Sequence, residues 1–134
     1  MASHIDNMRR LIEGLYLKTT SNQIKWTYDA DSGTYETKVN DFFIQCASEV
    51  DEAGDYYNLI KILNSSKDII DRINGGTLFP QKPVNTGHSA YWELFRDLRE
   101  AAERSASGAD EIIGDIVKAL GIDKIPLIND DVPF

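Results

Sequence analysis

The residues of this chain that are best suited to recognition chemistry are the last five, Asp130-Asp131-Val132-Pro133-Phe134. Phe134 carries an aromatic ring and a free α-carboxylate, so an apolar pocket with an Arg or Lys at its rim can hold both groups together. Pro133 has a fixed φ and so reduces the backbone freedom that is lost on docking. Asp130 and Asp131 add a screened attraction to basic residues around such a pocket. These residue types predict a partner-binding peptide at residues 130–134.

This ending resembles the acidic tip of bacterial and phage single-stranded DNA-binding proteins, which close on Asp-Asp, an aliphatic residue, Pro and Phe. The resemblance implies that the tail docks onto the proteins that receive that tip, namely exonucleases, helicases, recombination mediators and polymerase accessory subunits. The leading hypothesis is a non-enzymatic bacterial or phage accessory protein of DNA metabolism. Such a protein could either recruit those enzymes or compete for them.

The connection between the body and this tail departs from the pattern of that family. Single-stranded DNA-binding proteins usually place a long linker rich in Gly, Pro and Gln before the tip. Here residues 121–129 form a short connection in which Ile122, Ile125, Leu127 and Ile128 are apolar. We therefore expect the reach from the body to be limited, with Leu127 and Ile128 as candidates for packing on the protein's own surface.

A second set of residues offers chemistry for binding single-stranded DNA directly. Trp26 and Tyr28 lie on a predicted strand and could stack on bases, while Lys25, Lys38 and Lys61 could steer phosphates. This alternative makes the protein a divergent single-stranded DNA-binding protein with an aromatic-rich sheet. However, residues 22–73 contain ten acidic residues against five basic ones, and aromatic residues that alternate along strands often build a core under helices.

The remaining residues with reactive side chains predict neither a catalytic site nor a metal site. Asp29-x-Asp31 resembles the start of a calcium loop, but the glycine that follows comes one position early, so a hairpin turn is the better interpretation. His4 and His88 lie far apart without ligand-like neighbours, and Cys46 fits a small core residue better than a nucleophile. We expect a protein that is not an enzyme and that uses no cofactor.

Charge and composition predict a protein of the cytoplasm with protein partners. The formal net charge of the 134 residues is −8, and most of it lies in the body rather than in the tail. An acidic body suits basic protein partners, which leaves an inhibitor or immunity-type protein as a weaker alternative. The single cysteine fits a reducing compartment. No apolar run approaches the length of a membrane span, and the N-terminus lacks the features of a signal peptide.

Hydrophobic periodicity predicts one α+β domain over residues 1–121, followed by a tail with the docking tip over residues 122–134. A period of 3.6 residues indicates helices over residues 3–18 and 89–105, and Ser107 is the expected cap of a shorter third helix. A period of two and four short connections predict an antiparallel meander with strands over residues 24–28, 35–39, 42–47, 56–63 and 69–73. Residues 74–87 are expected to form an irregular loop. This order predicts a sandwich with helices over one face of the sheet.

The body also resembles small bacterial and phage α+β proteins of unknown function. The shared features are a Lys-Trp pair in the opening strand, a Tyr-x-x-Ile-x-Ile-x-Asn pattern from Tyr57 to Asn64, and an alanine-rich penultimate helix. This resemblance implies a fold and no mechanism.

Overall fold

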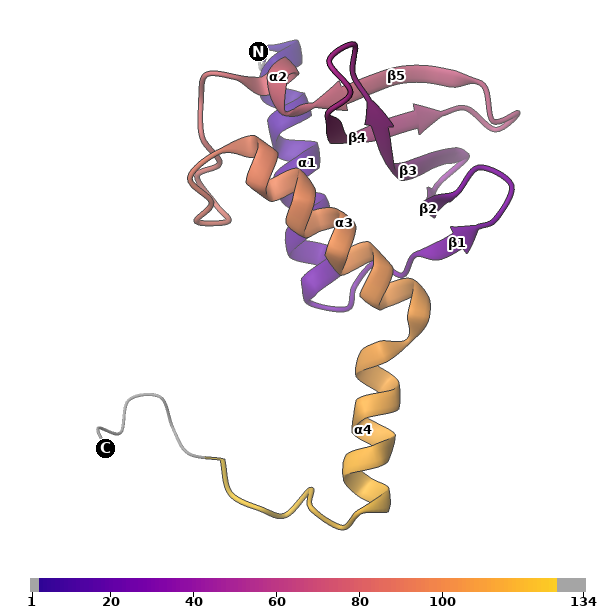
Figure 1. The fold of residues 1–134 in the computed structure, drawn as a ribbon, viewed down its shortest axis with the longest axis vertical. Coiled ribbons are helices and arrows are strands. Elements are labelled where there is room, and N and C mark those ends of the chain that lie inside the picture. The colour runs from indigo at the N-terminus through magenta and orange to yellow at the C-terminus, as the bar shows by residue number, and fades with distance from the viewer. Residues whose placement is uncertain (1–2, 128–134) are drawn as a thin grey trace.

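The computed structural model describes residues 3–127 and contains a helix, a five-stranded sheet and three further helices (Figure 1). The elements run in the order α1 (His4–Thr20), β1 (Thr27–Asp29), β2 (Thr34–Val39), β3 (Phe42–Val50), β4 (Tyr56–Leu63), β5 (Ile69–Asn74), α2 (Gly75–Leu78), α3 (Tyr91–Ser107) and α4 (Ala109–Ala119). The predicted α+β class, with an N-terminal helix, five antiparallel strands and C-terminal helices, is confirmed.

The sheet is an antiparallel meander with the strand order β1-β2-β3-β4-β5. Its tightest turn joins β2 to β3 through Asn40 and Asp41, and Asn40 adopts a positive φ of 54°, as two-residue hairpins require. The first strand is shorter than expected and begins at Thr27. The backbone N–H of Trp26 donates to the Ser105 hydroxyl at 2.9 Å and is thereby directed toward a helix.

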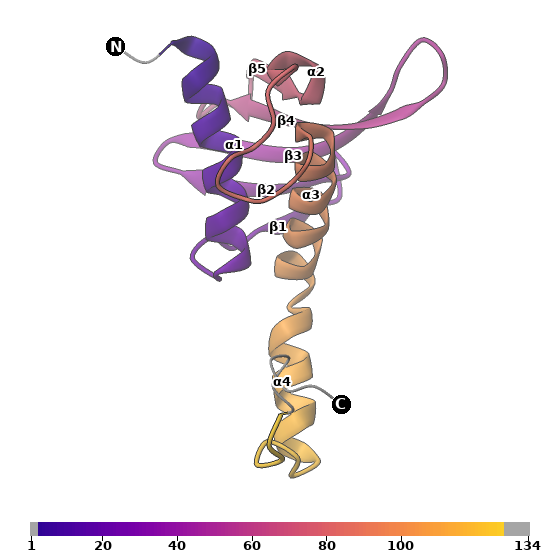
Figure 2. The same ribbon diagram turned by 90° about the vertical axis from the view of Figure 1, so that its left-hand side faces the viewer.

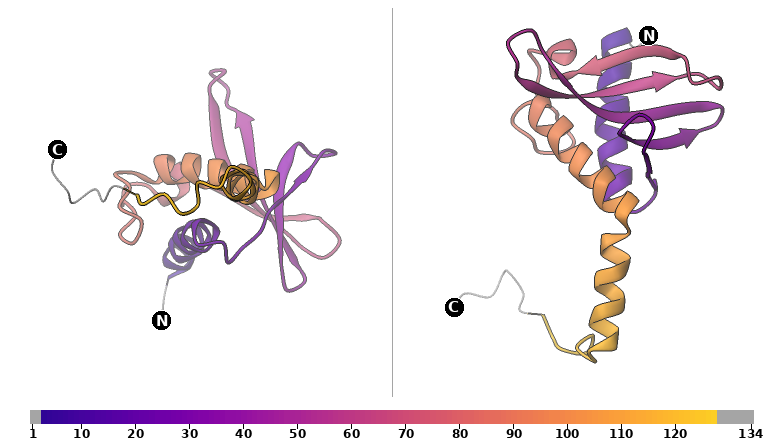
Figure 3. Two further views of the ribbon diagram at one scale, coloured as in Figure 1. Left: turned by 90° about the horizontal axis from the view of Figure 1, so that it is seen from below. Right: turned by 45° about the vertical axis from the view of Figure 1, so that its right-hand side comes forward.

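Helices α1 and α3 lie on the same face of the sheet (Figures 1 and 3). Helix α3 contacts all five strands, whereas α1 packs mainly against α3. Tyr35, Cys46, Ile60 and Ile73 occupy one row across β2 to β5, and all four side chains belong to the core under the helices or pack against it. Successive side chains of a strand point to opposite faces of the sheet, so apolar residues at every second position lie on the buried face.

The segment between β5 and α3 is more ordered than the predicted irregular loop. Asn74 caps the single turn of α2, and its side chain accepts from the Thr77 backbone N–H at 3.0 Å. Further along, the buried carboxylate of Glu13 accepts hydrogen bonds from the backbone N–H groups of Val84 and Asn85 at 3.0 and 2.9 Å. The hydroxyl of Tyr91 donates to the same carboxylate at 2.9 Å. One side chain of α1 therefore holds this segment in place.

Helix α4 does not cover the sheet, contrary to the prediction that the C-terminal helices pack over one face. It projects away from the body beyond the end of α3 (Figures 1 and 2), and none of its residues is buried. Ion pairs between Lys25 and Glu111 and between Arg104 and Asp110 lie at the junction. Apart from this junction, α4 makes no buried contact with the body.

The start of α4 also differs from the expected cap. Ser107 is the last residue of α3, and its hydroxyl donates to the carbonyl of Arg104 at 3.1 Å. Gly108 occupies the cap position between the two helices with a φ of 67°, a left-handed conformation that glycine adopts without strain. This single residue turns the chain out of α3 and into α4.

Candidate functional site

The partner-binding residues predicted from the sequence, residues 130–134, lie outside the described residues. The structure does describe the segment that carries them, which consists of α4 and residues 120–127. We call this segment the C-terminal arm. It runs from the junction at Gly108 to Leu127, whose side chain is 94% exposed. Leu127 therefore does not pack on the body, and Ile128 lies outside the described residues.

The arm has a defined bend after its helix. Gly121 has a φ of 69°, and its backbone N–H donates to the carbonyl of Lys118 at 3.0 Å. The N–H of Ile122 donates to the carbonyl of Val117 at 3.1 Å. These two bonds form a Schellman motif, which satisfies the last carbonyl groups of the helix. At 1.5 Å per residue, the helix itself is about 16 Å long, so the residues that follow α4 begin at that distance from its junction with the body.

Trp26, one of the predicted nucleic-acid-binding residues, is part of the core. Its side chain is 2% exposed, and its indole N–H donates to the Thr19 hydroxyl at 2.9 Å. A base cannot stack on a ring whose faces are covered. Tyr28 is 57% exposed but packs beside Tyr35 on the next strand, with ring centroids 5.3 Å apart. For Trp26 the structure shows the alternative interpretation, core packing.

The three predicted phosphate-steering lysines do not form one surface. Lys25 precedes β1 and pairs with Glu111 of α4 at 3.1 Å. Lys38 and Lys61 lie on the sheet face that no helix covers, and Lys61 pairs with Glu49 at 3.1 Å. Two of the three charges are thus already neutralised by carboxylates, which weakens their attraction for phosphate.

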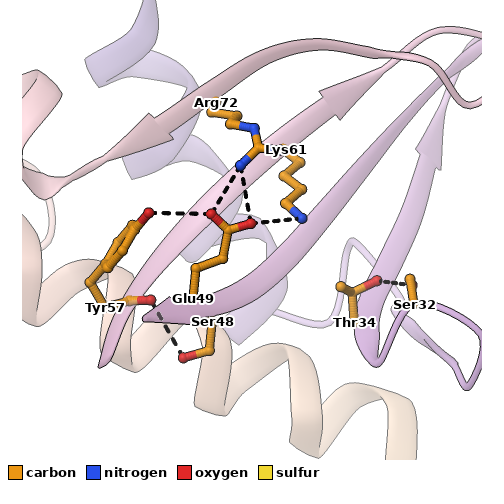
Figure 4. A network of polar contacts seen from close by, with 7 residues as sticks. All are labelled: Ser32, Thr34, Ser48, Glu49, Tyr57, Lys61 and Arg72. Carbon is orange, nitrogen blue, oxygen red and sulfur yellow. Dashed lines mark hydrogen bonds and ion pairs between the residues drawn. The ribbon is translucent and has the colours of Figure 1, made fainter. Parts of the chain in front are cut away.

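The uncovered face of the sheet carries a network of ion pairs centred on Glu49 (Figure 4). The Glu49 carboxylate accepts from Lys61 Nζ at 3.1 Å, from an Arg72 guanidinium nitrogen at 2.9 Å and from the Tyr57 hydroxyl at 3.2 Å. Together, the bond from Lys61 and the positive charges of Lys61 and Arg72 outweigh the effect of burial and lower the pKa of Glu49. Leu59, on the same face of β4 as Lys61, is 2% exposed.

Replacing Glu49 with glutamine is expected to remove a contribution to the free energy of unfolding that depends on pH. A lowered pKa means that the contribution of Glu49 is present above the ordinary glutamate pKa and is lost as the pH falls through the lowered value. The difference in free energy of unfolding between wild type and Glu49→Gln should be at most about 1 kcal/mol at neutral pH, because the site is partly exposed. Urea titrations from pH 7 down to pH 3 measure it; a difference that grows on acidification would contradict the expectation.

A cavity of about 580 Å³ opens beside the start of α3. Its walls include two exposed rings, Tyr56 at 80% and Trp92 at 61%, and the Arg96 guanidinium lies 5.5 Å from the centre of the Trp92 ring. The lining comes from Asp51, Tyr56, Tyr57, Asn58, Asn74, Gly75, Gly76, Trp92 and Arg96. A wall of this kind has the chemistry to hold a flat or aromatic group with an anionic end near Arg96.

Sequence reasoning missed this cavity. Trp92 and Arg96 lie four residues apart on the polar side of α3, and an aromatic residue outside the apolar stripe of a helix is a usable signal. The cavity itself comes from three segments that are distant in the sequence, the starts of β4, α2 and α3. No spacing within one segment indicates that they meet.

His88, for which no ligand-like neighbour was expected, lies in a chain of hydrogen bonds. Its two ring nitrogens are 2.8 Å from the Thr86 hydroxyl and 2.8 Å from the Asp97 carboxylate, and the ring packs edge-on against Tyr16. Burial opposes ionisation of Asp97, but hydrogen bonds from His88 and Arg96 lower the pKa of its carboxyl group. None of these residues except Arg96 lines the 580 Å³ cavity. The chain of bonds fastens the segment before α3 to that helix.

Within residues 3–127, no group of three or more His, Cys, Asp or Glu side chains is placed to hold a metal ion. No helix in the same range combines the length and the apolar character needed to cross a membrane. Comparison of the chain with protein-family models, with curated proteins and with solved structures finds no match.

Proposed function

We propose that this is a non-enzymatic accessory protein of bacterial or phage DNA metabolism, and that residues 130–134 dock into pockets that recognise the tip of single-stranded DNA-binding proteins. The observation that supports the proposal is the C-terminal arm. The docking sequence is attached to a helix that stands off the body, and the last described residue before it, Leu127, is 94% exposed. The arm thus offers reach that a short connection on a packed helix would lack.

In this proposal each residue of the tip has a separate role. Phe134 places its ring in the apolar part of the pocket and its α-carboxylate against a basic side chain at the rim. Pro133 restricts the backbone, and Val132 adds apolar contact beside it. Asp130 and Asp131 approach the basic surroundings of the pocket, so the affinity should fall as salt is added.

The arm gives the tip a mode of presentation that differs from a flexible linker. A long linker lowers the effective concentration of a tip at its target as the linker lengthens. Here α4, about 16 Å long, separates the residues that follow it from the body. We expect a partner to bind the tail without touching the body, so the same tip can serve partners of different shapes.

Deleting Phe134 is expected to abolish docking, because it removes the ring and moves the carboxylate out of register. A labelled peptide with the tip sequence is first bound to an exonuclease that receives the single-stranded DNA-binding protein tail. The full-length protein is then added as a competitor, and fluorescence polarisation is followed. Wild type should displace the peptide, and the deletion should raise the competing concentration by at least about 100-fold, in line with the loss of a central anchor.

Two matched variants make this experiment specific. One extra residue after Phe134 keeps the ring but displaces the carboxylate, and it should also stop competition. Asp123→Asn lies in the arm and removes one negative charge, and it should compete as wild type does. Equal competition by wild type and the Phe134 deletion would contradict the proposal.

A further inference from the structure

The C-terminal arm has an apolar side that nothing in the described part of the chain covers. Its exposed members lie on one side of α4 and along the residues after it. They are Ile112 at 53%, Ile113 at 51%, Ile116 at 51%, Leu120 at 67%, Ile122 at 40%, Ile125 at 61% and Leu127 at 94% exposure. Single exposed apolar residues are normal on protein surfaces, but a contiguous set of this size marks an interaction surface. We call this set the arm stripe.

The opposite side of α4 narrows the choice of what can cover the stripe. Asp110, Glu111 and Asp115 lie there with only one basic residue, Lys118, among them. A helix that lies on a membrane surface is typically rich in Lys and Arg on its polar side, because anionic lipids attract them. The acidic side of α4 would be repelled by such a surface. The expected partner is therefore a protein.

The order of residues in the stripe is close to symmetric about Ile116. Ile112 lies four residues before it and Leu120 four residues after it, while Ile113 and Ala119 lie three residues to either side. Two such helices that run antiparallel place Ile116 opposite Ile116 and Ile112 opposite Leu120. A two-fold axis needs a patch that is complementary to itself, and this spacing provides one.

Charge also favours an antiparallel pair. The first turn of α4 contains Asp110 and Glu111, which pair with Arg104 and Lys25 of the same chain, and Lys118 lies in its last turn. Beyond the helix, the charges of Asp123 and Lys124 offset one another. In an antiparallel pair Lys118 of each helix lies near the acidic first turn of the other, and the helix dipoles oppose one another. A parallel pair would bring like charges together.

The size of the stripe and its position both suit a second copy. Seven large apolar side chains, each at least 40% exposed, offer roughly 600 Å² per copy, which is at the lower end of the range for stable interfaces. Because α4 projects from the body (Figures 1 and 2), two arms can lie side by side with their bodies at opposite ends. We infer that two copies of this chain pair through the arm stripe, with their α4 helices antiparallel about Ile116. The inference does not depend on the docking tip.

Light scattering coupled to size exclusion tests the pairing on the full-length chain. Over a concentration series from about 1 to 200 µM, which covers dissociation constants in the micromolar range, wild type should shift from the monomer mass to twice that mass. Ile116→Asp puts a charge on the axis of both helices and should raise the dissociation constant at least ~50-fold. The control Asp115→Asn changes the neighbouring residue on the acidic side and should dimerise as wild type does.

Cysteine crosslinking with a short bis-maleimide tests the direction of the helices. Ile116→Cys should crosslink to itself, and a mixture of Ile112→Cys and Leu120→Cys should give a mixed dimer. Ile112→Cys alone should crosslink poorly, and so should Lys118→Cys on the opposite side. The native Cys46 is 2% exposed, and its burial raises the pKa of the thiol. It should therefore not react with the crosslinker.

Because α4 contributes no buried residue to the body, Ile116→Asp should leave the circular dichroism of the body and its melting temperature nearly unchanged. A wild-type monomer at every concentration would overturn the inference. A dimer that survives Ile116→Asp would overturn it as well, since the contact would then lie elsewhere. Efficient self-crosslinking of Ile112→Cys would show a parallel pair and reject the antiparallel arrangement.

Discussion

Replacing Glu13 with alanine is expected to lower the free energy of unfolding by about 3–5 kcal/mol, which is a large part of the stability of a domain of this size. The Glu13 side chain is 4% exposed and accepts from two backbone N–H groups, at Val84 and Asn85, and from the Tyr91 hydroxyl. Alanine leaves these donors without their acceptor; the bond from Tyr91 is buried, and the bonds from Val84 and Asn85 are partly buried. Chemical denaturation at pH 7 measures the loss.

Three further variants show how much of this loss comes from the hydrogen bonds of Glu13. Glu13→Gln keeps one acceptor oxygen and should cost less than alanine, about 1–3 kcal/mol. Tyr91→Phe removes one donor and should cost about 1–2 kcal/mol. The pKa of Tyr91 is raised to about 12 by burial and by its bond to Glu13, so its contribution to stability is present below about pH 10 and is lost as the pH rises toward 12.

Glu100→Ala, at an exposed position of α3, is the control and should leave the free energy of unfolding nearly unchanged. A Glu13→Ala protein as stable as Glu100→Ala would show that the carboxylate does not hold the segment.

Replacing Trp26 with alanine is expected to cost about 3–5 kcal/mol, the range for large buried aromatic side chains. Trp26 is 2% exposed and belongs to the same core cluster as Leu98 and Ala102 of α3. The substitution opens a cavity at the end of the sheet where α3 and the first strand meet. It also removes the hydrogen bond from the indole N–H to the Thr19 hydroxyl. Thermal and urea unfolding of the two proteins measure the difference.

Trp26→Phe is the matched control, because it keeps a large ring and loses the N–H donor. It should cost about 1–2 kcal/mol. The chain has two tryptophans, so Trp92→Phe leaves Trp26 as the sole reporter. Its emission should be blue-shifted and poorly quenched by acrylamide, and it should not change when oligo-dT is added. Strong quenching of Trp26, or a Trp26→Ala protein of wild-type stability, would contradict its placement in the core.

The docking tip and the arm stripe lie on the same segment of the chain and have separate tests. The tip is tested by competition for a pocket, and the stripe by the mass of the particle. An antiparallel pair of arms would carry two tips, and two linked tips bind a target with two pockets more tightly than one tip does. A monomeric Ile116→Asp variant that still competes through Phe134 would separate the two properties.

Much of the fold could be predicted because its determinants are local. Alternation of apolar residues marked the strands, and the short connections between them left only an antiparallel meander. The prediction of the first strand extended too far because Trp26 satisfies its backbone N–H with Ser105, a residue far along the chain. The four residues of α2 were missed because a single capped turn leaves no periodic pattern.

The candidate site could be predicted less well. Phe134 and its neighbours were recognised by residue type alone, which needs no tertiary information. Trp26 and Tyr28 look alike in the sequence, since both alternate on one strand, yet one is buried and the other exposed. The cavity beside Trp92 could not be predicted, because its walls come from three distant segments.

The sequence by itself determined the class of the fold, the meander, the amphipathic helices and a C-terminal peptide suited to docking. These properties depend on side-chain periodicity, turn chemistry and residue type, all of which act over a few residues. Only the tertiary structure decided which apolar faces meet. The apolar faces of α1 and α3 are both buried in the common core, whereas the apolar face of α4 is exposed. Burial depends on where the chain is directed in space, and the turn at Gly108 directs α4 away from the sheet and from the other helices.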